Sequence, residues 1–137
     1  GAYCAVAMRL TVDADTGHIK LDRALCATDI GLVINPDGAI NQIEGGIIQA
    51  SSWTLMEQLR LGKVGVESKD WASYPILTFP EVPLVDVELV DQADEPALGS
   101  GEASQGPTAA AIANAVANAT GKRIRDLPLT PARVKNT

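Results

Sequence analysis

Residues 3–29, "YCAVAMRLTVDADTGHIKLDRALCATD", decide the expected fold of this chain. They form two runs in which apolar and polar side chains alternate, a period of two that is typical of strands with one buried face. Asp15-Thr16-Gly17 lies between the runs, and glycine readily adopts the positive φ that tight hairpin turns require. The stretch therefore predicts two antiparallel strands joined by a short turn.

Each predicted strand has a definite apolar face. In residues 3–13 this face should consist of Cys4, Val6, Met8, Leu10 and Val12. In residues 18–29, Ile19, Leu21, Arg23 and Leu25 should lie opposite Lys20, Asp22 and Ala24.

A helix is expected over residues 39–61, where apolar side chains recur at helical spacing. Gly45 and Gly46 interrupt it, and each glycine inside a helix costs about 0.5–1 kcal/mol relative to alanine. A helix that keeps both glycines needs a close approach of its backbone to a neighbouring helix or to a ligand. Both alternatives remain open from the pattern alone.

The remaining segments complete a single α+β domain over residues 1–137. Residues 62–83 read as a loop, 85–91 as a third strand and 103–120 as a second helix that ends at Gly121, and the proline-containing tail should be extended. Ser104 is the best helix N-cap by residue type. We expect a small antiparallel sheet of three or four strands packed against two helices.

Composition excludes several classes of function. The net charge of −6, with no stripe of Lys or Arg, argues against a nucleic-acid partner. The sequence contains no run of roughly 18 apolar residues, so no membrane-spanning helix is expected. Cys4 and Cys26 have neither zinc nor redox spacing and are expected to be buried thiols, with a disulfide between them as the alternative. No cluster of His, Cys, Asp and Glu has the spacing of metal ligands. Because the chain starts with Gly1 and enters a strand at once, we expect a fragment of a longer polypeptide.

Two polar residues stand out as candidates for a site. Glu102, in "GSGEASQGPTAAAI" (99–112), lies where a helix dipole stabilises a carboxylate, while Gly99 and Gly101 let the backbone aim that carboxylate at a fixed point. Gln42 carries an amide that both donates and accepts hydrogen bonds, which suits a polar cofactor group. The alternatives are a merely dipole-stabilising Glu102 and a solvated Gln42. His18, the single histidine, is expected to be exposed.

Three runs, in order and in register, resemble a known family: "TDIGLVINPDGAINQIEGGIIQASSWTLMEQ", "SYPILTFPEVPLVDVELVD" and "GSGEASQGPTAAAIANAVANATGKRIRDLPLTP". They are similar to the C-terminal part of the molybdopterin-binding large (beta) subunit of the xanthine dehydrogenase and aldehyde oxidase family. Within it, the resemblance is closest to the bacterial isoquinoline 1-oxidoreductase beta subunits and nicotinate dehydrogenases. It covers essentially the whole chain.

The resemblance implies a molybdenum-dependent oxidoreductase that hydroxylates a carbon of an N-heterocycle or aldehyde with oxygen from water. Glu102 matches the family's general base on the molybdenum-bound hydroxyl. Gln42, Gly45, Gly46 and Gly101 match positions that bind the cofactor, and no residue of this chain is implied as a metal ligand.

The family also implies partners. The cofactor is a molybdenum pyranopterin, with the cytosine dinucleotide form as one alternative, and iron–sulfur clusters lie on a partner subunit or domain. The rest of the molybdopterin-binding subunit and an iron–sulfur small subunit are therefore expected partners, and this chain alone should be inactive. We expect a cytoplasmic location, with the periplasm as the alternative. The competing function is a non-catalytic α+β module for assembly or ligand binding.

Some positions depart from the family pattern. Gln49-Ala50-Ser51-Ser52 replaces a glycine-rich "QGxG" pattern, Leu98 or Gly99 stands where many relatives have lysine, and Ala103 replaces a proline after the glutamate. These departures leave the expected base in place and concern the shape of the substrate pocket.

Overall fold

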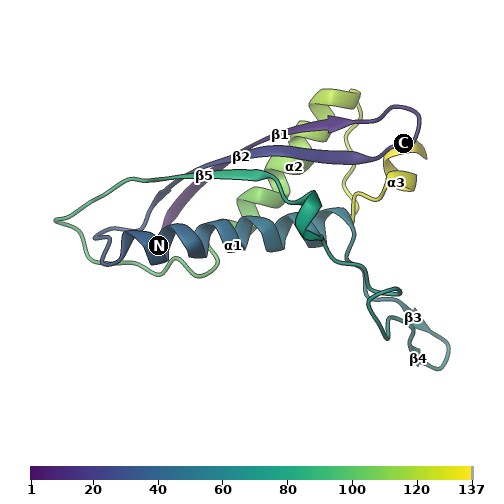
Figure 1. Cartoon of the computed structure of the whole chain (residues 1–137), viewed down its shortest axis with the longest axis horizontal. Helices are drawn as coiled ribbons and strands as arrows, with labels where there is room; N and C mark the ends of the chain where they lie inside the picture. The colour runs from purple at the N-terminus through teal and green to yellow at the C-terminus, as the bar shows by residue number, and fades with distance from the viewer. Residues whose placement is uncertain (137) are drawn as a thin grey trace.

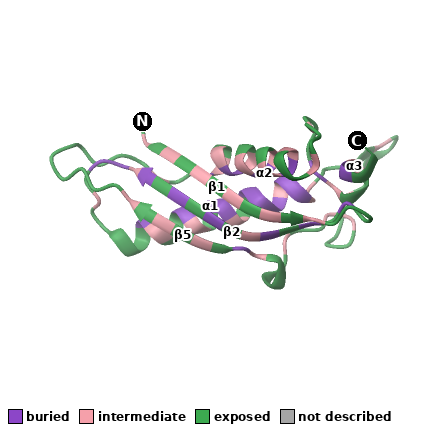
Figure 2. Cartoon of the chain, turned by 90° about the horizontal axis from the view of Figure 1, so that it is seen from above, coloured by how far each residue is buried: buried purple, intermediate pink, exposed green. Residues whose placement is uncertain are grey.

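The computed structural model describes residues 1–136: a three-stranded sheet is covered on one face by two helices, and a two-stranded sheet and a third, short helix lie outside this layer pair (Figure 1). Apolar side chains from both helices fill the space beneath the sheet. Along the strands, exposed residues alternate with more buried ones (Figure 2). The elements, in chain order, are β1 (Tyr3–Val12), β2 (Ile19–Asp29), α1 (Pro36–Leu55), β3 (Leu61–Gly62), β4 (Gly65–Val66), the 3-10 helix η1 (Phe79–Glu81), β5 (Leu84–Leu89), α2 (Gln105–Thr120) and α3 (Pro131–Asn136).

The predicted α+β class and the hairpin are confirmed, but the sheet is mixed. Its strand order is β1-β2-β5, with β1 antiparallel to β2 and Gly17 of the turn at φ 76°. β5 pairs with β2 in parallel, which corrects the expectation of a wholly antiparallel sheet. The reason is the connection: the chain passes beneath the sheet through α1 before it returns, and a long crossover of this kind joins parallel strands.

A bulge in β2 changes which side chains are buried. Arg9 pairs with Arg23 and Leu10 with Leu21, so Asp22 is an extra residue without a partner in β1. Beyond Asp22 the faces are exchanged, and Leu25 is 51% exposed. The prediction that Arg23 and Leu25 share the face of Leu21 is therefore wrong.

On the outer face, Arg23 forms a two-pronged ion pair with Asp86 of β5. Its Nε lies 2.5 Å from Oδ2 and its Nη2 lies 2.9 Å from Oδ1. These hydrogen bonds raise the pKa of Arg23 and lower the pKa of Asp86. Because both groups are solvated, the pair fixes the register of β5 on β2 more than it stabilises the fold.

The core has two parts, one beneath each end of the hairpin. Ile43 and Ile47 of α1 are fully buried against Ala24 and Cys26 of β2, while α2 contributes to the cluster around Leu21. The Cys4 and Cys26 sulfurs are free thiols 3.4 Å apart. Cys26 is buried as expected, whereas Cys4 is only half-buried. Burial raises the pKa of Cys26 to about 12, with a further contribution from Cys4.

Several element ends differ from the sequence-based expectation: α2 begins at Gln105 rather than at residue 103, and β5 spans Leu84–Leu89 rather than residues 85–91. α1 begins at Pro36, with the Asn35 side chain accepting from the Gly38 N–H at 3.0 Å, and it ends at Leu55, before the exposed side chains of Leu59 and Leu61. Residues 61–66 form the short β3–β4 hairpin, which projects from the body (Figure 1). Part of the tail is not extended, because α3 begins at Pro131, and proline is well tolerated at the first helical position.

The buried isoleucines of α1 should dominate the stability of the fold. Ile47 is 0% exposed and Ile34 is 80% exposed. Ile47→Ala should lower the free energy of unfolding by about 2–5 kcal/mol, since it leaves a cavity, while Ile34→Ala should change it by less than about 0.5 kcal/mol. Urea denaturation checks this, and similar losses for both variants would contradict the core assignment.

Candidate functional site

The loop that carries Glu102 is attached to the connection between β2 and α1. The Leu98 N–H donates to the Ile30 carbonyl at 2.8 Å, and the Leu32 N–H donates to the Glu95 carbonyl at 3.2 Å. At Gly31, where φ is 68°, a Cβ would lie 2.1 Å from the Pro96 carbonyl oxygen. The two segments therefore lie side by side and bring the start of α1 close to residues 97–101.

Gln42 and Gly101, two of the predicted cofactor-binding residues, are in direct contact. The Gln42 Nε2 donates a hydrogen bond of 2.8 Å to the Gly101 carbonyl, across 59 positions of sequence. Beside them is a hollow of about 390 Å³, lined among others by Ile34, Gly38 and Leu98. The amide oxygen of Gln42 has no partner among residues 1–136, so it can still accept a hydrogen bond.

Gly45 and Gly46 have different surroundings. Gly46 is buried, and a Cβ there would lie 2.4 Å from the Ser104 Oγ. Position 46 therefore has to be glycine because Ser104, at the start of α2, packs directly against it. Gly45 is exposed, and a Cβ there would have no group within 4 Å. The two alternatives for the glycine pair thus separate: packing explains Gly46, and the backbone at Gly45 is open to a ligand.

Glu102 lies in a turn just before α2, as expected. Its backbone carbonyl accepts from the Gln105 N–H at 3.2 Å, while its side chain is exposed. No hydrogen bond or ion pair within residues 1–136 engages its carboxylate. The group is therefore available to an incoming ligand.

Ser104 occupies the N-cap position of α2, but its side chain does not cap the helix. Its hydroxyl donates instead to the Ile43 carbonyl of α1 at 3.1 Å, and its own carbonyl accepts from the Thr108 hydroxyl at 2.7 Å. Gln105 Nε2 donates to Gln49 Oε1 at 3.2 Å. The hydrogen bond from Ser104 to Ile43 was not predicted from the sequence. A serine before a helix indicates a local cap, whereas Ile43 is distant in sequence.

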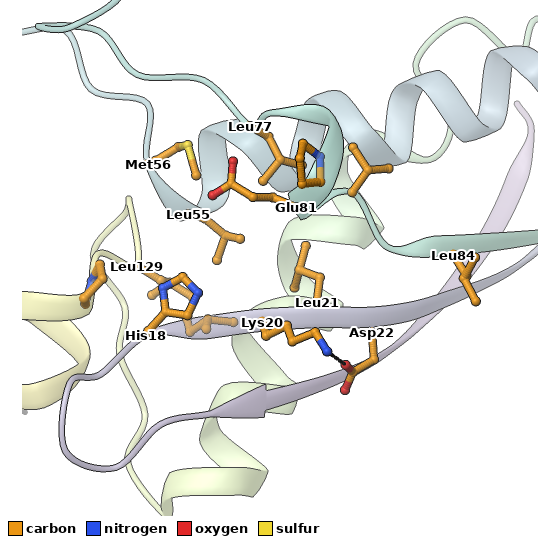
Figure 3. A pocket seen from close by; sticks show the side chains of 14 residues that line it. His18, Lys20, Leu21, Asp22, Leu55, Met56, Leu77, Glu81, Leu84 and Leu129 are labelled. Atoms are coloured by element: carbon orange, nitrogen blue, oxygen red, sulfur yellow. Dashed lines mark ion pairs between the residues drawn. The ribbon is translucent and has the colours of Figure 1, made fainter.

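A second hollow, of about 560 Å³, lies at the other end of the sheet (Figure 3). Leu21, Leu55, Leu77 and Leu129 converge on it, and Lys20 forms an ion pair with Asp22 at its rim, 3.6 Å apart. His18 is exposed, as expected.

Glu81 also faces this hollow, and its carboxylate is engaged locally. Its Oε2 accepts from the Thr78 hydroxyl at 2.6 Å and from the Thr78 N–H at 2.8 Å, which lowers the pKa of Glu81. The hollow contains none of the predicted site residues. We therefore assign the candidate site to the Gln42–Glu102 region.

Neither a metal-binding cluster nor a membrane-spanning helix is present in the described chain. Residues 1–136 contain no group of three or more His, Cys, Asp and Glu side chains that could hold a metal ion. In the same range, no helix is both long and apolar enough to cross a membrane.

Comparison with known proteins relates the chain to molybdenum enzymes. Residues 1–83 match the model of the molybdopterin cofactor-binding domain. A nicotinate dehydrogenase subunit of Pseudomonas putida is 45% identical over 98% of this chain, and the beta subunit of the isoquinoline 1-oxidoreductase of Brevundimonas diminuta is 34% identical over 96% of it. The solved aldehyde oxidoreductase of Desulfovibrio gigas superposes with a TM-score of 0.89 at 29% identity over 98% of this chain.

The chain spans a small part of these relatives: 11% of the nicotinate dehydrogenase subunit, 17% of the isoquinoline oxidoreductase subunit and 15% of the aldehyde oxidoreductase. The matched residues 1–83 include Gln42, Gly45 and Gly46, whereas Gly101 and Glu102 lie outside them.

The Gly46–Ser104 contact predicts a non-additive pair of substitutions. Gly46→Ala should lower the free energy of unfolding, because the new Cβ displaces the Ser104 hydroxyl. Ser104→Ala should lower it by about 1 kcal/mol through the lost hydrogen bond. In the double variant two Cβ atoms would lie 3.8 Å apart, an ordinary contact. A double-mutant cycle in urea should therefore give less than the sum of the single losses, and simple additivity would contradict the contact.

Proposed function

The chain belongs to the molybdopterin cofactor-binding domain family, and on that premise we propose that it forms part of the cofactor and substrate site of a molybdenum-dependent oxidoreductase. The proposed reaction is the hydroxylation of an N-heterocycle or aldehyde carbon with oxygen from water. Nicotinate and isoquinoline, which are named in two relatives, are N-heterocycles, and a third relative acts on aldehydes by its name.

The residues at the site fit a pterin cofactor. Gly38, Gln42 and Gly45 recur at helical spacing on the exposed side of α1. The open backbone at Gly45 lets a flat ring system approach the helix, and the free amide oxygen of Gln42 can accept from a ring N–H. We assign Gln42, Gly45 and Gly101 to cofactor binding. A cofactor contact at Gly46 stays a prediction, since Ser104 fills the space in front of it.

The bound cofactor supplies the two-electron oxidation that accompanies transfer of oxygen from water to the substrate carbon. This chain supplies a proton acceptor. The Glu102 carboxylate is free of partners among residues 1–136 and lies two residues before Ser104, which occupies the N-cap position of α2. Its oxygens can therefore take up the proton released when the water-derived oxygen attacks carbon.

The observation that carries this proposal is the hydrogen bond from Gln42 to Gly101. It joins the helix proposed to hold the cofactor to the residue directly before Glu102, so that both functions meet at one place. Because the chain spans only a fraction of its relatives, we propose that the rest of the molybdopterin-binding subunit completes the cradle. Electrons would leave through iron–sulfur clusters on a partner subunit.

Glu102→Gln tests the proposed base in the cofactor-loaded protein. The amide keeps the shape of the side chain but does not take up the proton, so the rate of enzyme reduction by nicotinate, isoquinoline or an aldehyde should fall by about 10²–10⁴-fold. Molybdenum and pterin content should not change. Glu95→Gln, on the same loop and also exposed, is the matched control and should retain its rate. A fast Glu102→Gln enzyme would favour a non-catalytic module instead.

Gly45→Ala separates stability from cofactor binding. Since Gly45 is exposed in α1 and has open space around it, alanine should stabilise the apo fold by about 0.5–1 kcal/mol. The added methyl group should at the same time hinder the approach of the cofactor and lower the bound molybdenum. Metal analysis together with thermal unfolding checks both parts, and a stabilised variant with full cofactor content would remove Gly45 from the site.

A further inference from the structure

Glu102 lies between two points at which its segment is attached to α1. On one side, the Gly101 carbonyl accepts from the Gln42 amide at 2.8 Å. On the other side, the Ser104 hydroxyl donates to the Ile43 carbonyl at 3.1 Å. The carboxylate itself is exposed and has no partner within the described chain. Its position therefore depends on how firmly its neighbours are held.

The glycine side of this segment cannot provide that firmness by packing. A Cβ at Gly99 or Gly101 would have no group within 4 Å, so no neighbouring side chain packs against these glycines, and the Gln42 bond to Gly101 holds this side. Glycine also has more backbone freedom to lose on ordering than other residues. The attachment that is buried lies on the other side, in the residues that follow Glu102.

Ser104 has the properties of such an attachment. It is 1% exposed, and its backbone carbonyl is held by the hydroxyl of Thr108, which is 0% exposed. A serine at this position ordinarily caps its own helix, yet here the hydroxyl points across to α1. The missing side chain at Gly46 provides the space for it, since a Cβ there would lie 2.4 Å from the Ser104 Oγ.

We propose that Ser104 is a positioning residue for Glu102: the bond from its hydroxyl to Ile43, in the space left by Gly46, sets where the catalytic carboxylate points. This role rests on the proposed function of Glu102 as the base. Ser104 is buried, so its hydroxyl is not on the exposed surface that carries the Glu102 carboxylate. It acts through the two-residue span to Glu102, and an error of about 1 Å in the position of a reacting group can reduce a rate by about 10²-fold.

The test is Ser104→Ala in the cofactor-loaded protein, with Ser51→Ala as its matched control. Ser51 is also 0% exposed and also donates to a carbonyl of α1, that of Ile47 at 2.8 Å, but this bond stays inside one helix. Both variants lose a buried serine hydroxyl of the same kind. Only the first loses the bridge next to Glu102.

Ser104→Ala should lower kcat by about tenfold or more, with KM and molybdenum content near those of the unmodified protein, because binding groups stay in place while the base is misplaced. Amide hydrogens of residues 102–105 should exchange at least about tenfold faster, since that part of the segment opens more readily. Ser51→Ala should change neither kcat nor this exchange. Gly46→Ala displaces the same hydroxyl from the α1 side and should reproduce the Ser104→Ala result. If Ser104→Ala does not fold, Gly46→Ala provides the test instead.

The outcomes separate the two proposals. If Glu102→Gln is slow while Ser104→Ala and Gly46→Ala match Ser51→Ala in kcat and exchange, the positioning role is wrong and the base remains. If Glu102→Gln keeps its rate, the proposed function is wrong and the positioning role falls with it. A slow Glu102→Gln enzyme supports the inference when kcat also drops in Ser104→Ala and Gly46→Ala but not in Ser51→Ala, with faster exchange at 102–105 only in the first two.

Discussion

The contact between Gly46 and Ser104 is the constraint on which the arrangement of the site depends. Both helices lie on the same face of the sheet, and this contact fixes how closely the first turn of α2 approaches α1. A larger residue at position 46 would push α2 away and would carry Glu102 with it. A single missing side chain in one helix thus determines where a carboxylate before the other helix lies.

Most of the fold could be predicted because its signals are local. Alternation in residues 3–29 predicts the hairpin, and Gly121, at φ 72°, ends α2 as its residue type indicates. The bulge at Asp22 could not be predicted, because the residue types of a strand do not reveal which residue lacks a partner in the neighbouring strand. The parallel direction of β5 also depends on the path of the whole chain through α1 rather than on residues 84–89.

The site is predictable as a set of residues and not as an arrangement. Patterns alone leave Glu102, Gln42 and the glycine pair with two interpretations each, and the family resemblance supplies their expected roles. Gln42 and Gly101 are far apart in sequence, so no local sequence pattern predicts their hydrogen bond. The residue type of Ser104 predicts a cap because capping is the commonest use of serine before a helix, and its bond to α1 becomes visible only when both helices are placed.

The central claim is that a molybdenum cofactor binds against α1 at Gln42 and Gly45, within reach of Glu102. The most direct measurement is the position of the metal, from anomalous scattering at the molybdenum edge in crystals of the cofactor-loaded protein. The account predicts a single peak on the exposed side of α1 that carries Gly45, facing the Glu102 carboxylate. A peak at the other end of the sheet, in the hollow lined by Leu21, Leu55 and Glu81, would contradict it.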